Sequence, residues 1–286
     1  MKTVKSIWEV KEYVKDLRRK GKSIGFVPTM GYLHAGHLSL VQESIRRCDC
    51  TVVSIFVNPT QFAPNEDFNK YPRNIKRDIE VLEKEGVDLI FIPGDGEMYP
   101  EGYHTYVEVK NLQDRLCGGS RPGFFKGVCT IVLKLFNIVT PDISFFGQKD
   151  AQQAVILKKM ARDLNLDVKI EVLPIIREKS GLALSSRNEY LDKKQKKAAL
   201  CLSRSLGRAR KMVEAGEKNA ARVLKIIKTE IKSEPLARID YVEIVDSENL
   251  KSLKQIKDKT LIAVAVFIDN IRLIDNIIIK IRRRKI

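Results

Sequence analysis

The sequence predicts an α/β fold in which a parallel sheet, covered by helices, is followed by a smaller α+β domain. In the first half, apolar β-branched runs alternate with segments of helical spacing. One run, residues 51–57, is almost entirely apolar, as expected for a parallel strand covered on both faces. This β-α-β alternation implies parallel strands joined by right-handed crossovers. After residue 191 two charged helices precede alternating strands, which predicts an α+β unit.

The elements of the first half follow from hydrophobic periodicity. Apolar residues at helical spacing, such as Ile7, Val10 and Val14, mark amphipathic helices, and short apolar runs mark buried strands. In chain order we expect a helix at 6–19, a strand at 23–27, a helix at 37–47, and a strand at 51–57. A helix at 73–85, a strand at 88–92, and a more exposed strand at 104–110 follow.

The rest of the chain is assigned in the same way. We expect an apolar helix at 128–139, a strand at 142–146, a helix ending near 163, and a strand at 168–172. A polar loop precedes two helices within 192–232, which are separated near Gly216, and strands at 239–245, 261–268 and 272–275. We place the domain boundary after residue 185, giving a catalytic domain over 1–185 and a lid domain over 186–286.

Composition bounds the class of protein. The chain has 286 residues, 44% hydrophobic and 31% charged, which is typical of a soluble globular protein with a full core. The net charge of +16 fits a phosphate-bearing substrate, a polyanionic partner, or a Lys/Glu-rich surface of the heat-adapted kind. Aromatic residues do not interleave with the basic ones, so we expect no nucleic-acid partner. A basic tail, 280–285, closes the chain.

Cysteines and hydropathy suggest the compartment. The five cysteines are odd in number and lack the spacing of a zinc site, so we expect free thiols. The N-terminal segment is a charged amphipathic helix rather than a signal sequence, and no apolar run is long enough to span a bilayer. We therefore expect a cytoplasmic protein without membrane contact.

The central motif lies at residues 28–40, between a predicted strand and a helix. A strand, a glycine-containing turn and a helix start present backbone N–H groups and a positive helix end to an anion. His34 and His37 occupy this turn, three residues apart, and can face the same way. Each could instead be a structural histidine or a helix cap. Because two of the three histidines share one Gly-flanked turn, we favour a phosphate site in which neutral imidazoles donate hydrogen bonds.

Three further polar clusters follow predicted strands, and the carboxyl ends of parallel strands share one crevice. They are Asn58 with Gln61, Lys149 with Asp150 and Gln153, and the run 185–187 (Ser-Ser-Arg). Amides suit a ligand that carries hydroxyl and carboxylate groups, a lysine suits phosphate, and hydroxyls with a guanidinium suit a mobile lid over a triphosphate. The alternatives are turn residues, an N-cap by Asp150 and an ordinary loop.

These stretches, in this order, resemble the pantoate–β-alanine ligase family. The resemblance covers most of residues 1–190 and rests on PTMGYLHAGHLSLV, FVNPTQF, YPRN, FFGQKDAQQ and SGLALSSRNEYL. It implies a Rossmann-like domain, the substrates ATP, pantoate and β-alanine, and Mg²⁺ carried with the ATP phosphates. Pantoate would attack the α-phosphorus of ATP, and β-alanine would then attack the resulting pantoyl adenylate to give pantothenate, AMP and pyrophosphate. It also implies a homodimer through the first domain, to which the apolar run 129–139 could contribute.

The resemblance also assigns residues. It implies that His34, His37 and Lys149 are catalytic, with His37 the usual candidate for proton donor and Lys149 stabilising the pentavalent state. ATP would contact Met30, His34, His37, Gly147, Lys149, Asp150, Ile176, Leu184, Ser185, Ser186 and Arg187. Pantoate and β-alanine would contact Asn58, Gln61 and Gln153.

Three positions depart from the family pattern. Phe124 occupies a position where the family usually has a histidine. The role of that histidine therefore cannot be assigned to a residue of this chain. Leu184 replaces a methionine at the start of the lid, where an apolar contact tolerates the change. The acidic pair sometimes given to magnesium is Arg77 and Asp78 here, which leaves Asp78 as the one candidate protein ligand.

Two other functions fit part of the pattern. A nucleotidylyltransferase that keeps a dinucleotide product would share the histidine motif, but the amide cluster argues against it. An RNA-binding protein would fit the positive charge, but neither an anticodon-binding module nor an aromatic platform supports it.

Overall fold

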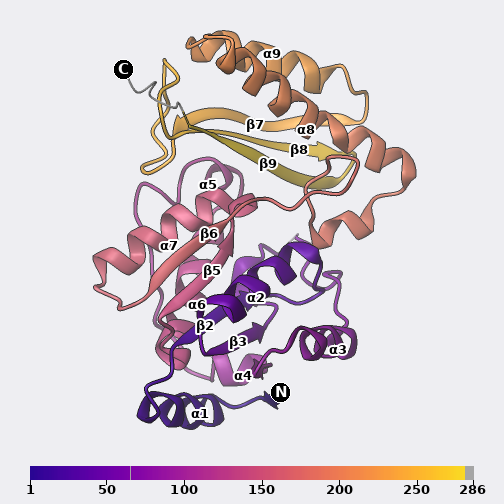
Figure 1. Ribbon diagram of the computed structural model, residues 1–286. Coiled ribbons are helices and arrows are strands. Elements are labelled where there is room, and N and C mark those ends of the chain that lie inside the picture. Colours follow the sequence, from indigo (N-terminus) through magenta and orange to yellow (C-terminus); the bar gives the residue numbers. More distant parts are fainter. Residues whose placement is uncertain (65, 281–286) are drawn as a thin grey trace.

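The computed structural model describes residues 1–64 and 66–280, and it confirms the predicted fold class (Figure 1). Most of the basic tail, 281–285, lies outside the described residues. Six parallel strands form one sheet in the order β1-β4-β3-β2-β5-β6. Their bounds are β1 Lys2–Val4, β2 Ile24–Thr29, β3 Cys50–Ile55, β4 Leu89–Phe91, β5 Ile143–Gly147 and β6 Lys169–Leu173.

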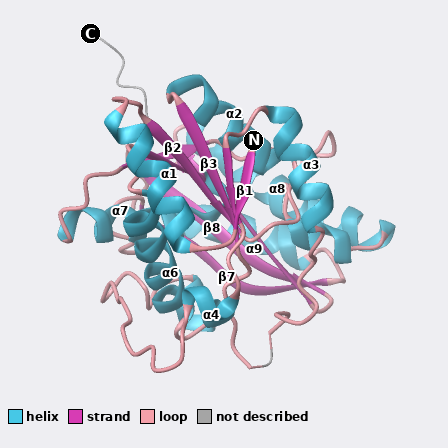
Figure 2. Ribbon diagram, turned by 90° about the horizontal axis from the view of Figure 1, so that it is seen from below, coloured by secondary structure: helices cyan, strands magenta, loops and turns pink. Residues whose placement is uncertain are grey.

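Helices cover both faces of this sheet. Figure 2 shows α1, α6 and α7 gathered on one side of the strands and α2 and α3 on the other. The helices of this part are α1 Ile7–Arg19, α2 Ala35–Arg47, α3 Ile75–Glu85, α4 Asp95–Met98, α5 Cys117–Ser120, α6 Phe124–Val139 and α7 Ala151–Asp163. Two 3₁₀ turns, η1 Pro59–Gln61 and η2 Gln148–Asp150, follow the ends of β3 and β5.

The side chains of the central strands alternate between two covered faces of the sheet, which explains why these strands are mostly apolar. Phe26 and Val52 pack in the cluster that holds α1 and α6, whereas their neighbours Val27 and Val53 pack in the cluster that holds α2 and α3. Successive side chains of a strand point to opposite faces, so a sheet that is covered twice needs apolar residues at every position. All four side chains are fully buried.

The sheet order reverses between β2 and β5, which defines the switch point where ligands of open α/β sheets bind. These two strands are in register at only two positions, Gly25 with Ile143 and Phe26 with Ser144. Beyond this point β2 pairs only with β3, and β5 only with β6. The carboxyl ends of the two strands are therefore unpaired with each other, beside the turns that carry the predicted histidines and lysine.

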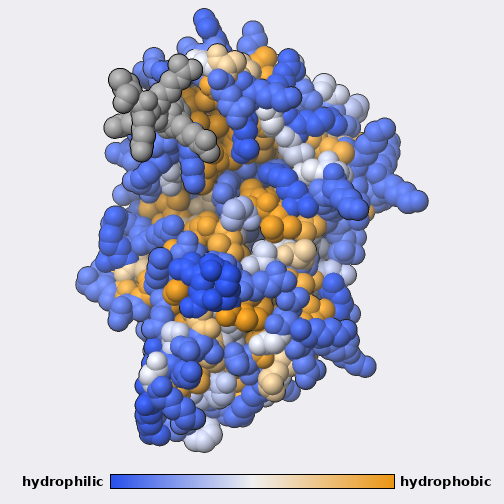
Figure 3. All heavy atoms as spheres, viewed as in Figure 1, coloured by the Kyte–Doolittle hydropathy of each residue, from blue (hydrophilic) through white to orange (hydrophobic). Residues whose placement is uncertain are grey.

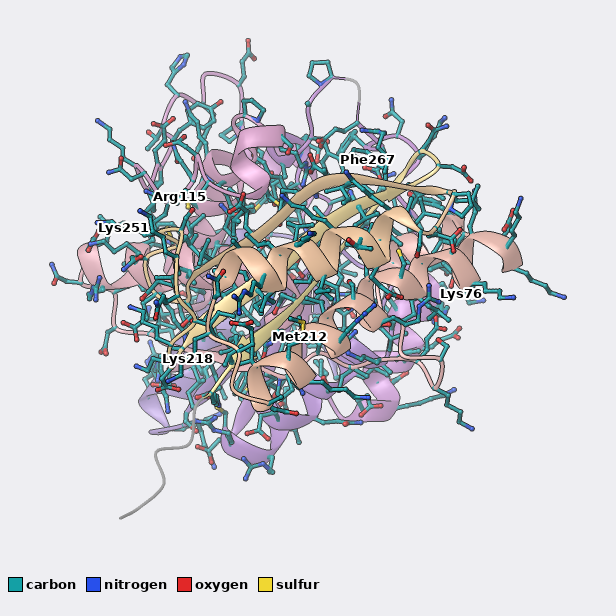
Figure 4. All side chains as sticks on the ribbon, turned by 90° about the horizontal axis from the view of Figure 1, so that it is seen from above. Lys76, Arg115, Met212, Lys218, Lys251 and Phe267 are labelled. Carbon is teal, nitrogen blue, oxygen red and sulfur yellow. The ribbon has the colours of Figure 1, made fainter. Side chains whose placement is uncertain are left out.

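The C-terminal part is a three-stranded antiparallel sheet covered by two helices. Its elements are η3 Ser186–Tyr190, α8 Lys193–Glu214, α9 Ala220–Lys232, β7 Ala237–Asp246, β8 Thr260–Ile268 and β9 Ile271–Ile279. Figure 4, seen from above, shows α8 and α9 lying across this sheet. Val264 packs beneath these helices, whereas its neighbour Ala263 belongs to the core of the larger domain, so the small sheet is covered on both faces.

Several predictions need correction. The strand predicted at 104–110 is wrong, because the N–H groups of Val107 and Val109 donate to the side chains of Thr130 and Gln113 rather than to a strand. Strand β1 and the short helices α4 and α5 were not predicted. The apolar side chains of 129–139 are mostly buried within the chain's own core.

The five cysteines are free, as expected. None of the helices within residues 1–64 and 66–280 combines the length and the apolarity needed to cross a membrane.

Candidate active site

A cavity of about 280 Å³ lies at the switch point, between the large sheet and the C-terminal sheet. Figure 3 shows apolar side chains at mid-height, where these two parts meet, and mainly polar ones elsewhere. Thirteen of the predicted site residues line the cavity: Met30, His34, His37, Gln61, Gly147, Lys149, Asp150, Gln153, Ile176, Leu184, Ser185, Ser186 and Arg187. The structure thus brings together segments that are up to 157 residues apart, from Met30 to Arg187 (187 − 30).

The two histidines are stacked at the start of α2. Their ring centres lie 4.1 Å apart, with an angle of 27° between the ring planes. Nδ1 of His34 accepts the N–H of Gly36 at 3.1 Å, and Nδ1 of His37 accepts the N–H of His34 at 3.4 Å. In a neutral imidazole the proton must then be on Nε2. Both rings therefore carry a hydrogen-bond donor on Nε2.

Burial keeps both imidazoles neutral. It lowers the pKa of His34 to about 4, with the Lys149 charge acting in the same direction. Burial also lowers the pKa of His37 well below its ordinary value, with further contributions from His34 and Lys149. At neutral pH the rings can donate their N–H to phosphate oxygens, but neither has an additional proton to transfer before a ligand binds. This supports the hydrogen-bonding role and weakens the proton-donor role implied for His37.

Gly36 is required by the close approach of a ring. A Cβ at this position would lie 2.9 Å from two atoms of the His34 imidazole, closer than nonbonded atoms approach. Position 36 therefore has to lack a side chain if His34 is to stay over the helix end. The spacing of the motif thus has a steric reason in addition to a chemical one.

Asp78 holds the turn before the histidines. Its carboxylate accepts the N–H of Tyr32 at 2.7 Å and that of Leu33 at 2.8 Å, and only 1% of the residue is exposed. Burial raises its pKa, although these bonds oppose the shift. Both oxygens are thus engaged, and the carboxylate does not line the cavity. The expectation that Asp78 could bind a metal is therefore corrected to a structural role.

No group of three or more His, Cys, Asp or Glu side chains that could hold a metal ion occurs within 1–64 and 66–280.

Asn58 lies behind Gln61 and does not line the cavity. Its Nδ2 donates to Gln61 Oε1 at 2.8 Å and to the Gly127 carbonyl at 3.2 Å. Its Oδ1 accepts from Thr60 at 3.0 Å and from Tyr99 at 2.8 Å. Because the whole amide is engaged, the expectation that Asn58 holds substrate is corrected. It orients Gln61 instead, by donating to the oxygen of the Gln61 side-chain amide.

Lys149 lies on η2, directly after β5. Its Nζ is 3.7 Å from Oδ2 of Asp150, and about a fifth of its side chain is exposed. Asp150 occupies the N-cap position of α7 but makes no side-chain cap bond, and half of its side chain is exposed. The capping alternative is thus wrong, and the half-exposed carboxylate, paired with Lys149, lines the cavity. Gln153 lines the same wall, one helical turn further on.

The 185–187 segment lies against the histidine turn. The Ser186 hydroxyl donates to the carbonyl of Tyr32 at 3.3 Å, and the Ser185 hydroxyl accepts the N–H of Arg187 at 3.3 Å. The Arg187 guanidinium binds Asp67 through two hydrogen bonds. Segments that follow β2 and β6 thus meet on one side of the cavity.

A family model described as pantoate-beta-alanine ligase matches residues 2–278. The chain belongs to the pantoate–β-alanine ligase family. It is 56% identical over 274 residues to the pantothenate synthetase of Pelotomaculum thermopropionicum, covering 96% of this chain and 97% of that one. It is 55% identical over 282 residues to that of Carboxydothermus hydrogenoformans, covering 98% and 100%.

Solved structures agree with this assignment of the ligase. The pantothenate synthetase of Thermus thermophilus superposes with a TM-score of 0.93 at 42% identity, over 97% of this chain and 99% of that chain. A pantoate-beta-alanine ligase from Francisella tularensis, complexed with beta-gamma ATP and beta-alanine, gives 0.79 at 34% identity over 97% of each chain.

Sequence reasoning missed several cavity residues of this ligase. Arg121 lines the cavity, donates to the Gln61 carbonyl at 3.1 Å, and binds Glu66. Its guanidinium carbon lies 3.7 Å from the ring centre of Phe124, which also lines the cavity. Phe124 thus supplies an apolar surface beneath a cation, in place of the family's histidine. An arginine next to a glycine turn was the signal for Arg121, whereas nothing in the sequence marked Tyr71, which also lines the cavity.

Proposed function

We propose that this ligase condenses pantoate with β-alanine at the expense of ATP, giving pantothenate, AMP and pyrophosphate. The observation that carries the proposal is the meeting of neutral imidazole donors, one lysine and two glutamine amides in one cavity. The imidazoles and the lysine suit phosphate, and the amides suit a hydroxy acid. The Francisella relative, crystallised with a form of ATP and with β-alanine, supports the same pair of ligands.

In the first half-reaction a pantoate carboxylate oxygen attacks the α-phosphorus, and the bond to the β-phosphate oxygen breaks, releasing pyrophosphate. Negative charge grows on the phosphate oxygens in this step. We assign its stabilisation to Lys149 and to the Nε2–H groups of His34 and His37. Gln61 and Gln153 hold pantoate. Met30, Gly147, Asp150, Ile176 and Leu184 hold the nucleoside part of ATP.

In the second half-reaction the β-alanine amine attacks the carbonyl of the pantoyl adenylate, and AMP leaves. An acyl adenylate hydrolyses readily, so water must be kept away from it. We assign this task to the segment Ser185, Ser186 and Arg187, which closes over the triphosphate. The 186–286 unit, which begins inside this segment, then serves as the lid domain, and 1–185 as the catalytic domain.

Mg²⁺ is proposed as a companion of ATP. Since the Asp78 carboxylate is engaged by backbone N–H groups, the phosphate oxygens are the natural ligands for the ion. The ion would neutralise phosphate charge.

The family resemblance also leads us to propose a homodimer and a cytoplasmic location. The 1–185 domain would form the interface, although most side chains of 129–139 are already covered within one chain. The free cysteines fit a reducing compartment. Analytical ultracentrifugation tests the dimer.

The test of the function is isotope exchange. The wild-type protein should exchange labelled pyrophosphate into ATP when pantoate is present and β-alanine is absent. Pyrophosphate exchange that does not depend on pantoate would contradict the proposal. Lys149→Ala should lower the exchange rate about 100- to 1,000-fold while the circular dichroism spectrum stays unchanged, since it removes one charge that stabilises the transition state. A nucleotidylyltransferase would exchange only with a phosphorylated acceptor.

A further inference from the structure

Two buried polar residues lie side by side on β9, at the edge of the small sheet. Asp275 and Asn276 are each 3% exposed, although the neighbouring Leu273 and Ile277 belong to an apolar core. Burying polar groups costs free energy unless they are hydrogen-bonded. Both side chains are bonded to parts of the chain more than 90 residues away. These contacts, all made to segments of the cavity wall, call for an explanation.

Asn276 is bonded to the turn that carries Lys149. Its Nδ2 donates to the carbonyls of Gln148 and Lys149, at 3.0 Å each. Its Oδ1 accepts Nε2 of Gln148 at 3.1 Å. One side chain of the C-terminal sheet thus makes three hydrogen bonds to η2. That turn has no side-chain cap of its own.

Asp275 is bonded to the segment that leads to the 185–187 run. Its carboxylate pairs with Arg177 through two bonds, 2.6 and 2.8 Å long. Arg177 also donates to the carbonyl of Gly181 at 3.1 Å and forms a β-bridge with Ala183. Arg177 thereby fixes the loop that ends just before Ser185. Since Asp275 also accepts the N–H of Asn276 at 2.7 Å, the two side chains form one connected unit.

We propose that the Asp275-Asn276 pair is a positioning element of the active site. Asn276 fixes the backbone of the Lys149 turn, and Asp275 fixes the approach to the 185–187 segment. Alternation along β9 makes this possible, because adjacent side chains of a strand point to opposite faces. One short stretch of an edge strand can therefore reach both the turn after β5 and the loop after β6. This inference rests on the roles proposed above for Lys149 and for the 185–187 segment.

Two further interdomain contacts show that this pair is not needed merely to join the two parts. Ser120 donates to Asp240 at 2.8 Å, and Nη2 of Arg272 donates to Sγ of Cys117 at 3.3 Å. Neither contact involves η2 or the loop before Ser185. Loss of the Asn276 bonds would therefore leave the parts joined while freeing the Lys149 turn. A displacement of about 1 Å at a catalytic group can lower a rate about 100-fold.

The test separates the two half-reactions. Asn276→Ala should lower pantoate-dependent pyrophosphate exchange about 10- to 100-fold, because Lys149 acts in adenylation. For the second half-reaction, pantoyl adenylate is first accumulated on the enzyme with pyrophosphatase present. Its single-turnover reaction with β-alanine should then stay within about twofold of wild type, because Lys149 has finished its task. Asn276→Ser, which is also smaller than asparagine, repeats the test if the alanine variant does not fold. Ser120→Ala is the matched control and should leave both rates unchanged.

The second arm tests Asp275. Asp275→Asn keeps the shape but removes the charge that holds Arg177, so the KM for ATP should rise about tenfold, with a smaller effect on kcat. The proposal would be overturned if the Asn276 variants lowered the rates of both half-reactions equally, or lowered neither. An unchanged KM for ATP in Asp275→Asn would also overturn it. Absence of pantoate-dependent exchange in the wild-type protein would instead refute the proposed function.

Discussion

Arg187 and Asp67 form an ion pair with two hydrogen bonds beside the cavity, Nε to Oδ2 at 3.0 Å and Nη2 to Oδ1 at 2.9 Å. Burial alone would raise the pKa of Asp67, but the bonds and the charge of Arg187 lower it overall. Arg187 lines the cavity, and Asp67 does not. A triphosphate that binds Arg187 must therefore compete with a carboxylate that already occupies it.

Removing this competitor should strengthen ATP binding. Asp67→Asn weakens the hold on Arg187, and a partly exposed ion pair contributes up to about 1 kcal/mol, or roughly fivefold in affinity. Calorimetric titration with a non-hydrolysable ATP analogue should give a Kd that is two- to fivefold lower than that of wild type. Asp163→Asn, which breaks an exposed pair at the far end of α7, should leave the Kd unchanged. A Kd for Asp67→Asn that is higher than that of wild type would mean that Asp67 orients Arg187 rather than competes for it.

Two glycines allow a matched test of the histidine turn. Gly36→Ala puts a methyl group 2.9 Å from the His34 ring and should lower turnover at least about tenfold by displacing that ring. Gly207, inside α8, has no atom within 4 Å of an added Cβ. Gly207→Ala should leave turnover unchanged and stabilise the fold by about 0.5–1 kcal/mol. Normal turnover in Gly36→Ala, with an unshifted His34 in its crystal structure, would contradict the steric argument.

The depressed pKa of His34 has a consequence for acid stability. Between its ordinary value of 6.5 and the folded value of about 4, the unfolded chain binds a proton that the folded chain does not. Stability therefore falls as pH drops through this window, and His34 makes no such contribution above it. Urea denaturation at pH 7 and pH 4.5 should show a smaller loss of unfolding free energy in His34→Asn than in wild type. Identical losses would show that His34 titrates normally.

Asn58 and Gln61 should differ in what their removal affects. Asn58→Ala leaves buried partners unpaired and should destabilise the fold by about 1–3 kcal/mol. Gln61→Ala removes an amide that faces the cavity, so it should mainly raise the pantoate concentration needed for half-maximal exchange. Denaturation and exchange assays on both variants check this. Greater destabilisation by Gln61→Ala than by Asn58→Ala would reverse the assignment of the two roles.

The sequence predicted most of the fold because its long elements carry their own periodicity. The helices α1, α8 and α9 repeat apolar residues at helical spacing, and β3 is mostly apolar. Strand β1 was not predicted because three residues are too few to show a hydrophobic period. Its place in the sheet comes from pairing with β4. The false strand at 104–110 alternates correctly, but side chains of α6 and of a nearby turn take up its N–H groups.

The site was predicted where a motif fixes the chemistry, as at His34 and Lys149. Prediction failed where orientation decides the role. The amide of Asn58 turns towards Tyr99, which is 41 residues away, and no local pattern specifies that contact. Likewise, two backbone N–H groups occupy the oxygens of Asp78, and no local pattern distinguishes this structural carboxylate from a metal ligand.

The brief pairing of β2 with β5 joins residues 118 positions apart. Strands β1 to β4 are complete by residue 91, so four of the six strands of the sheet can form on the ribosome while β5 is still being made. A nascent chain at that stage carries both imidazoles but lacks Lys149. We therefore expect ATP affinity to arise late in synthesis, when β5 docks beside β2, and we expect an incomplete chain to gain little protection from the nucleotide.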